Sequence, residues 1–409
     1  MAAGSQAIRL AMPARGESTT LTVLPPLALY VHMPWCVKKC PYCDFNSHEL
    51  RGALADEAYA EALVRDLEQA LPLIWGRRVY SIFIGGGTPS LFPAERIDAL
   101  LAAFRARLTL DADCEVTLEA NPGTFEAQKF RDYRAAGVNR LSIGIQSFNP
   151  KHLKALGRIH DDSEAWRAVE IASREFDNLN LDLMYALPEQ TLDEAMADCA
   201  AALSCGTNHL SFYHLTLEPN TLFHVEPPPI PDDDAAAAIQ DALQAKLSVG
   251  GYVNYETSAW AKPGRECRHN VNYWQFGDYL GIGAGAHSKL SFPDRIIRQA
   301  RYKLPKSYAE ELDRGSAVSQ ETPVGRRDLP FEFMMNALRL REGFAVELFT
   351  ERTGLPISAA QKPLARAEEK GLIERDHQRI RPTELGRRFL NDLLELFLPE
   401  APATGARAE

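Results

Sequence analysis

Long apolar runs are missing from this 409-residue sequence. None approaches the roughly 18–20 residues that a membrane-spanning helix requires. Positive charge is also in deficit, because 45 Lys and Arg residues face 55 Asp and Glu residues and give a formal net charge of −10. General nucleic-acid binding favours basic surfaces, so this balance argues against it. With 45% hydrophobic and 24% charged residues, the composition is typical of a globular protein with no integral membrane segment.

Cysteine is scarce and unevenly placed. The seven cysteines are an odd number, which suits a reducing compartment, and we expect a cytoplasmic protein. Cys36, Cys40 and Cys43 form a C-x3-C-x2-C triplet. Such a triplet places three thiolates on one tight loop, where they can bind three corners of a [4Fe–4S] cluster and leave one iron open. The alternative is a structural zinc site that His32 or His48 completes.

Short apolar strands alternate with longer amphipathic stretches from Leu27 to His214. Six such units imply parallel strands with right-handed crossovers, in a doubly wound sheet or an incomplete (β/α) barrel. We expect Ser163 to cap the fourth helix and Gly137 to close the third. The expected strands are Leu27–His32, Val79–Gly85, Glu115–Glu119, Arg140–Ile145, Asn180–Met184 and His209–His214, and the expected helices are Asp56–Leu71, Ala94–Leu108, Phe125–Ala136, Ser163–Phe176 and Leu192–Ser204.

The remainder of the chain predicts a loop, a small second domain and two unpatterned ends. Helical stretches followed by a short hairpin in residues 300–398 resemble a winged helix, for which the acidic chain favours a packing or lid role. We expect a flexible extension over residues 1–24, which faintly resembles a mitochondrial presequence, and a disordered tail over residues 399–409. The expected elements are a loop at Glu218–Asp234, a helix at Ala235–Leu247, a strand at Tyr252–Glu256, helices at Phe331–Leu340, Ala345–Thr353 and Ser358–Lys370, a hairpin of Gly371–Glu374 and Arg379–Arg381, and a helix capped by Thr383.

Polar motifs fall at or near the carboxyl ends of the expected strands, where barrels bind their ligands. The glycines of Gly85-Gly-Gly-Thr-Pro-Ser90 let backbone approach a ligand closely. Glu119 can accept hydrogen bonds from ribose hydroxyls or an ammonium group, and Arg158 can form a bidentate pair with a carboxylate. Asp182 lies within an apolar strand, where a carboxylate is costly unless it is paired.

The triplet, with Tyr42 before its third cysteine, resembles the C-x3-C-x-aromatic-C signature of the radical S-adenosylmethionine (SAM) superfamily. This resemblance implies an α/β fold with a partial (β/α)6 TIM-type barrel, here over residues 25–290. It also implies that Cys36, Cys40 and Cys43 hold a [4Fe–4S] cluster whose open iron binds SAM. An electron from a donor to the cluster then splits SAM to a 5′-deoxyadenosyl radical. The cluster and SAM carry the hard chemistry, while the protein positions them.

Further motifs resemble one branch of that superfamily, the oxygen-independent coproporphyrinogen III oxidases and their relatives. They are Tyr30-Val-His-Met-Pro, Gly-Gly-Gly-Thr-Pro-Ser, Glu-Ala-Asn-Pro, Arg-Leu-Ser-Ile-Gly-Ile-Gln-Ser-Phe and Asp-Leu-Met-Tyr-Ala-Leu-Pro, within roughly residues 28–288. The SAM contacts implied by this resemblance are Tyr30, Tyr42, Gly86, Gly87, Thr88, Glu119, Gln146, Arg158, Asp182 and His287.

Two departures separate the sequence from the oxidase itself. The oxidase has a further cysteine two positions after the third, where this sequence has Phe45. The oxidase also carries an amino-terminal substrate-clamping segment, whereas the residues before the first expected strand here are only loosely patterned. The string Arg268-His-Asn-Val-Asn-Tyr-Trp274 instead resembles the H-N-x-x-Y-W element of the HemW heme chaperones, as does Gly281-Ile-Gly-Ala-Gly-Ala-His-Ser288. A heme-binding segment near residues 265–288 follows from this resemblance, and acceptor hemoproteins become the expected partners.

The implied heme contacts are His269, Asn270, Tyr273 and Trp274. Histidine is a common axial ligand of heme iron, and aromatic rings can stack on the porphyrin face. Cys267 could add a thiolate or a covalent attachment, whereas the alternative for the whole segment is a packed loop. The leading hypothesis is therefore a heme chaperone. Its rivals are oxidative decarboxylation of coproporphyrinogen III and a zinc-bound structural or DNA-associated protein.

Overall fold

The structure is a computed structural model that describes residues 20–124 and 127–399. Most of the expected extension and nearly all of the expected tail lie outside the described residues. One residue of the described part of the extension, Leu21, is anchored to the folded chain. Leu21 is 5% exposed, lies in the core of the C-terminal unit, and donates its backbone N–H to the carbonyl of Pro293.

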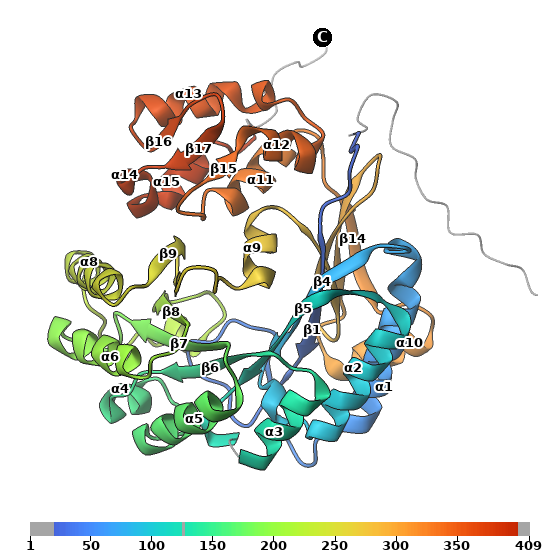
Figure 1. Cartoon of the computed structure of the whole chain (residues 1–409), viewed down its shortest axis with the longest axis vertical. Helices are drawn as coiled ribbons and strands as arrows, with labels where there is room; N and C mark the ends of the chain where they lie inside the picture. The colour runs from blue at the N-terminus through green and yellow to red at the C-terminus, as the bar shows by residue number, and fades with distance from the viewer. Residues whose placement is uncertain (1–19, 125–126, 400–409) are drawn as a thin grey trace, which may run out of the picture.

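A curved sheet of twelve strands forms the centre of the described chain (Figure 1). Its strand order is β14-β13-β12-β11-β1-β4-β5-β6-β7-β8-β10-β9, and the strands from β11 to β8 are parallel. The parallel strands are β11 (Asp278–Ile282), β1 (Leu27–Met33), β4 (Arg78–Gly86), β5 (Thr109–Ala120), β6 (Arg140–Gln146), β7 (Leu179–Tyr185) and β8 (His209–His214). In the part of the chain that the structure describes, the two edges of the sheet do not pair with each other, so the barrel is partial, as the family resemblance implies.

Helices cover the outer face of this sheet (Figure 1). They are α1 (Asp56–Ala70), α2 (Ala94–Arg107), α3 (Ala127–Ala136), α4 (Pro150–Ala155), α5 (Asp162–Glu175) and α6 (Leu192–Ser204). Gly137 ends α3 with a φ of +110°, as predicted. The predicted cap of α5 is wrong by two residues, because the side chain of Asp161, and not that of Ser163, accepts the Glu164 N–H. Residues 125–126 of the expected third helix lie outside the described residues.

Further strands extend the sheet at both edges, and two of them, β13 and β14, lie beyond the expected limit of the core at residue 290. They include β12 (His287–Ser291), β13 (Ile296–Arg301) and β14 (Val318–Pro323) on one edge, with β10 (Ala259–Ala261) and β9 (Val253–Glu256) on the other. Helix α10 (Pro305–Asp313) packs against α1. The C-terminal unit therefore begins after Pro323 and not at residue 300. The loop expected at Glu218–Asp234 contains the short helix α7 (Leu222–Val225) and the start of α8 (Asp233–Val249).

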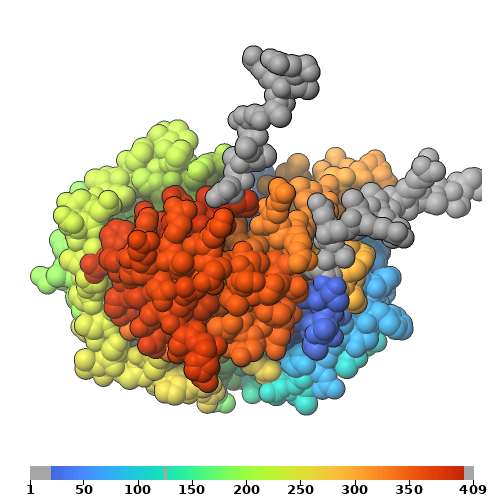
Figure 2. Space-filling model, turned by 90° about the horizontal axis from the view of Figure 1, so that it is seen from above, coloured from blue at the N-terminus to red at the C-terminus, as the bar shows by residue number. Residues whose placement is uncertain are grey.

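The C-terminal unit has the helices and hairpin of a winged helix around its own apolar core. Its elements are α11 (Leu329–Ala337), β15 (Phe344–Ala345), α12 (Val346–Thr353), α13 (Gln361–Glu369), β16 (Ile373–Arg375), β17 (Arg379–Pro382), α14 (Glu384–Arg388) and α15 (Leu390–Glu395). The predicted hairpin and the Thr383 cap are confirmed. In Figure 2 this unit, in orange and red, covers the middle of one face beside the yellow-green region of α8. An ion pair between Arg388 and Asp241 joins them.

Helix α9 (Arg268–Trp274) lies between the strands and the C-terminal unit (Figure 1). It ends just before β11 begins, and β11 runs parallel to β1, so α9 is at the amino ends of the parallel strands. The two ends of the partial barrel thus carry different motifs. Within the described parts of the chain, no helix is long and apolar enough to cross a membrane.

Candidate functional site

A cavity of about 340 Å³ lies at the carboxyl ends of the parallel strands. The structure brings most of the predicted site residues to this cavity, although they come from six separate segments of the chain. Those that line it are Cys36, Cys40, Cys43, Tyr42, Gly86, Gly87, Thr88, Glu119, Gln146, Arg158 and Asp182. We call this cavity the cluster pocket.

The three predicted cluster cysteines lie between β1 and β3 (His48–Glu49), Cys36 in the short strand β2 (Trp35–Cys36) and the other two in the loop that follows it, and none of the three forms a disulfide. The loop is closed by hydrogen bonds from the Cys43 N–H to the Cys40 carbonyl and from the Ser47 N–H to the Phe45 carbonyl. Burial raises the pKa of the Cys36 and Cys43 thiols. Iron binding removes the proton from a thiol, so a cluster would have to overcome this preference for the neutral form.

The alternative of a zinc site gains no support from the side chains around the triplet. Nδ1 of His32 lies 2.9 Å from the Tyr30 hydroxyl and its Nε2 lies 2.9 Å from the Asn46 carbonyl, so both ring nitrogens have partners. His48 directs Nε2 at the Lys303 carbonyl. In residues 20–124 and 127–399, no three His, Cys, Asp or Glu side chains converge as a single ion requires. Cysteines that hold a cluster bind different irons and need not converge.

The glycine turn after β4 fits tightly against the cysteine loop. Gly86 has a φ of +116°, and a Cβ atom there would lie 2.6 Å from the His32 ring. A Cβ at Gly87 would lie 2.5 Å from the Trp35 carbonyl oxygen. The N–H groups of Gly87 and Thr88 donate to the Met33 and Trp35 carbonyls. Only glycine therefore allows the turn to lie this close to the loop.

Two carboxyl groups, Glu119 on β5 and Asp182 on β7, face the cluster pocket. Burial, with the nearby Asp182, raises the pKa of Glu119 to about 8, although the Gly86 N–H donates to its Oε2 at 3.0 Å. Burial also raises the pKa of Asp182, which accepts hydrogen bonds from Ser142 at 2.6 Å and Asn180 at 2.9 Å. The pocket therefore holds acceptors that ionise readily once a ligand supplies donors or positive charge.

Arg158 supplies the cationic side chain among the predicted pocket residues. Its Nη2 donates to the Gly144 carbonyl and to Asn121 Oδ1, both at 2.8 Å, while Nη1 lies 3.5 Å from the Cys40 sulfur. Its buried Nε has no hydrogen-bond partner in the described structure. This free N–H can therefore donate to an anionic group of a ligand. Gln146, at the end of β6, has a φ of +67°, a strained backbone of the kind found at ligand sites.

Tyr30 and His287 do not line the cluster pocket. Tyr30 lies inside the barrel, where its hydroxyl contacts His32 and its ring lies 6.4 Å from that of His269. His287 is exposed at the start of β12. Sequence reasoning also missed residues that do line the pocket. Asn121 belongs to the Glu-Ala-Asn-Pro motif, and its side chain donates to Thr88 at 2.9 Å. Tyr213 and His214, at the end of β8, line the pocket too.

His269 projects from α9 into the opposite end of the barrel. It is 9% exposed, its ring centroid lies 5.0 Å from that of Phe83, and its Nδ1 lies 3.2 Å from the Ser81 hydroxyl. Burial, together with the positive charge of Arg140, lowers its pKa to about 3. The imidazole is therefore neutral, as iron coordination requires, but its ring is enclosed by strand residues. Asn270, Tyr273 and Trp274 are half-buried on the same helix, and Arg339 lies 4.4 Å over the Trp274 ring.

The start of α9 is held by one buried carboxylate. Glu115 accepts hydrogen bonds from the backbone N–H groups of Arg268 and His269, each at 3.2 Å. The thiol of Cys267 lies 3.5 Å from the same carboxylate. Burial raises the pKa of this thiol to about 12, so it stays protonated at neutral pH. A thiolate at Cys267, as at Cys36 and Cys43, would therefore form only if bound iron displaced this proton.

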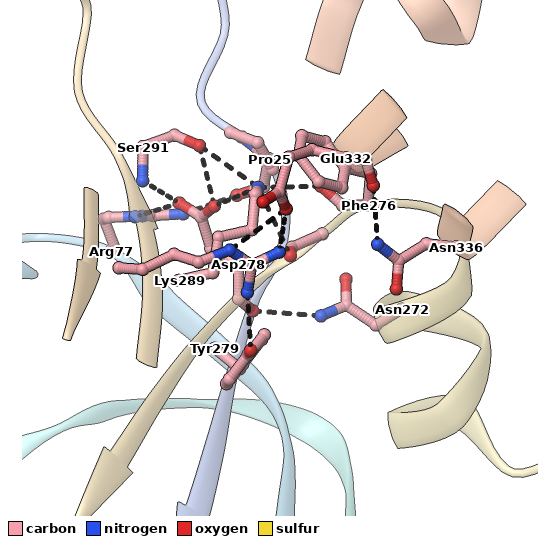
Figure 3. A network of polar contacts seen from close by, with 12 residues as sticks. Pro25, Arg77, Asn272, Phe276, Asp278, Tyr279, Lys289, Ser291, Glu332 and Asn336 are labelled. Atoms are coloured by element: carbon pink, nitrogen blue, oxygen red, sulfur yellow. Dashed lines mark hydrogen bonds and ion pairs between the residues drawn. The ribbon is translucent and has the colours of Figure 1, made fainter. Parts of the chain in front are cut away.

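A buried ionic network holds the end of α9 and the start of β11 (Figure 3). The ammonium of Lys289 donates to Asp278 Oδ1 and to the Phe276 carbonyl, both at 2.9 Å. Arg77 binds the second oxygen of Asp278 at 2.8 Å. Phe276 in turn packs against Phe333 of the C-terminal unit at 5.7 Å. This network fixes α9 to the sheet and to the second domain together.

Comparison with known proteins agrees with the fold. Residues 30–200 match the radical SAM superfamily, and residues 324–389 match the HemN C-terminal domain. The chain is similar to the solved structure of coproporphyrinogen III oxidase (HemN) from Escherichia coli, with a TM-score of 0.79 and 25% identity over 91% of this chain and 90% of that one. Membership of the radical SAM superfamily implies a [4Fe–4S] cluster and SAM.

Curated relatives match almost the whole chain. Heme chaperone HemW of Escherichia coli (strain K12) is 50% identical over 92% of this chain and 99% of its own length. Heme chaperone HemW of Haemophilus influenzae is 48% identical with the same coverage. The mitochondrial radical S-adenosyl methionine domain-containing protein 1 of Bos taurus is 35% identical over 90% of this chain and 86% of its length. On this near-complete similarity, the chain belongs to the HemW heme chaperone family of the radical SAM superfamily.

Proposed function

We propose that this protein binds one heme and delivers it to acceptor hemoproteins. The observation that carries the proposal is 50% identity to a protein named a heme chaperone, over 99% of that relative's length. Phe45 adds support, because it stands where the oxidase has a cysteine and is 59% exposed at the cluster pocket. The partners are therefore heme, acceptor hemoproteins and an electron donor.

The cluster pocket supplies the residues for the two cofactors. Cys36, Cys40 and Cys43 would hold the [4Fe–4S] cluster, which, when reduced, supplies the electron that splits SAM. Arg158 would pair with the SAM carboxylate through its unpartnered Nε, and Glu119 would accept from an amino or hydroxyl group. The cavity of about 340 Å³ lies in the size range of single small-ligand sites. The other predicted SAM contacts that line the pocket are Tyr42, Gly86, Gly87, Thr88, Gln146 and Asp182.

The oxidase reading is the second candidate, since a structure at a TM-score of 0.79 carries that activity in its name. An anaerobic assay separates the two. Reconstituted protein is incubated with SAM, a reductant and coproporphyrinogen III, and protoporphyrinogen is measured after oxidation to the fluorescent porphyrin. We expect no turnover. Catalytic formation of protoporphyrinogen would contradict the chaperone proposal.

The heme residues His269, Asn270, Tyr273 and Trp274 stay a prediction from the sequence. Replacement of His269 by alanine tests it through heme affinity, with cluster absorption as the control for folding. Weaker heme binding with an intact cluster would support the α9 site. Unchanged affinity would assign the iron ligand to another histidine.

A further inference from the structure

The enclosed environment of His269 disfavours this histidine as the ligand of heme iron. A porphyrin needs open space beside the coordinating nitrogen. The His269 ring instead lies among Phe83, Tyr30 and Ser81, and the backbone of its helix is bound to Glu115. Coordination there would require α9 to leave the barrel. An open histidine elsewhere would avoid that cost.

His214 is the histidine that lines the cluster pocket. It ends β8, its side chain is exposed, and its ring lies 5.2 Å from the Tyr185 ring in an edge-on arrangement. In residues 20–124 and 127–399, neither of its ring nitrogens forms a hydrogen bond. Partial burial of the ring lowers its pKa, against the opposing effect of Asp233, so a neutral nitrogen is available to iron at neutral pH.

Exposed apolar side chains surround this opening. Phe45 on the cysteine loop is 59% exposed and Tyr213 on β8 is 41% exposed, and both line the pocket. Helix α7 borders the same loop, because the Phe223 N–H donates to the Pro41 carbonyl at 3.0 Å. Its Leu222 is 56% exposed. Exposed apolar groups in one place mark a binding surface.

The charge at the opening is mixed. Lys38 lines the pocket and is exposed, so it can pair with one propionate, while Asp44 and Glu218 also line the pocket and would repel a propionate placed beside them. The enclosed part of the pocket is at the small end of ligand cavities, so it can take SAM while a porphyrin lies outside it.

We infer that heme lies across the mouth of the cluster pocket, with Phe45 against the porphyrin face and His214 as the axial ligand of its iron. This inference rests on the proposed heme-binding function. It places the cargo beside the cluster and SAM, whereas the α9 site would place it at the opposite end of the barrel. It also gives Phe45, the residue that replaces the oxidase cysteine, a direct contact.

The test is a heme titration of anaerobically reconstituted full-length protein, with absorption spectra in the Soret and cluster regions. His214→Gly should weaken heme binding at least about tenfold and lose the histidine-ligated spectrum, and added imidazole should restore that spectrum. Phe45→Ser should weaken binding about three- to tenfold, from the loss of aromatic contact. His377→Ala is the matched control, since this exposed histidine lies in the C-terminal hairpin.

Each outcome decides the inference. Normal heme affinity and spectrum in His214→Gly would overturn it, as would loss of heme in His269→Ala or in His224→Ala with His214 intact. If the His214→Gly variant loses its cluster, the heme titration of Phe45→Ser tests the inference instead, because Phe45 is exposed. Normal heme affinity in Phe45→Ser would then overturn the inference. Failure of the wild-type protein to bind heme would instead contradict the proposed function.

Discussion

At the scale of single residues, Glu119 is the clearest source of pH dependence. Its pKa of about 8 leaves it largely neutral at pH 7 in the protein without ligand. A bound SAM donor favours the carboxylate, so binding releases a proton and affinity rises with pH. We expect an increase of up to about tenfold per pH unit below the pKa. Anaerobic SAM titrations of the reconstituted protein across this pH range measure the slope.

Glu119→Gln is the matched control, because it keeps the shape of the side chain and removes its titration. The difference between the two proteins isolates Glu119 from any titration of SAM itself. The raised pKa of Glu119 also predicts how its contribution to the free energy of unfolding changes with pH. Its folded pKa exceeds the ordinary value of 4.5, so its contribution is greatest below that value and is lost as pH rises through about 8. An identical SAM slope in both proteins would remove Glu119 from the site.

The sequence predicted most of the pocket residues because their motifs end parallel strands, and parallel strands bring those ends together. It could not place His269, since the same H-N-x-x-Y-W pattern fits an open ligand or a buried anchor. The deciding contacts come from Ser81 and Glu115, which are more than 150 residues away in the chain. His214 was missed because a single histidine at the end of a strand has no spacing signal.

At the scale of secondary-structure elements, the start of α5 gives a direct test. Asp161 and Glu164 form a capping box, while Ser163 only donates its hydroxyl to Asp161 at 2.7 Å. Replacement of Asp161 by alanine should destabilise the protein by about 1 kcal/mol. Ser163→Ala should have a smaller effect. Urea unfolding of both variants measures the difference, and the reverse order would contradict the observed cap.

Strands β11 to β14 were not predicted from the sequence. Strand β11 pairs in parallel with β1, about 250 residues earlier, as in the pair Leu27 and Asp278. Polar residues interrupt β12 to β14, so no apolar run marks them. Two of these residues, Lys289 and Arg301, are 1% exposed. Their burial depends on Asp278 and Asp66, which a local reading does not connect to them.

At the scale of the whole molecule, the network around Lys289 joins the sheet, α9 and the C-terminal unit (Figure 3). Lys289→Met leaves Asp278 buried with Arg77 as its remaining charged partner. We expect a loss of about 3 kcal/mol in the free energy of unfolding. Lys306→Ala, which removes an exposed pair with Glu310, should change it little. Urea unfolding compares them, and equal stabilities would contradict the role of the network.

This network also has a predictable pH dependence. Burial opposes ionisation of Asp278, but Lys289 and Arg77 outweigh it and lower the pKa of the carboxyl group below 3.8. Its stabilising contribution is therefore present above the ordinary pKa and is lost as pH falls through the lowered one. Lys289→Met should weaken this loss on acidification.

The molecule thus separates two regions at opposite ends of one partial barrel. The cluster pocket lies at the carboxyl ends of the parallel strands, while α9 and the C-terminal unit close the amino ends. In this arrangement the winged-helix-like unit packs, through Phe333, against Phe276 in the turn that follows α9. Its expected packing role follows from that contact.

The central claim is that this radical SAM protein handles heme, and one titration tests it most directly. Heme is added to the anaerobically reconstituted full-length protein, with and without SAM, while the Soret band and the cluster absorption are recorded together. The account predicts a saturable Soret band close to one heme per chain beside an unchanged cluster absorption. Cluster absorption with no saturable Soret band would contradict it.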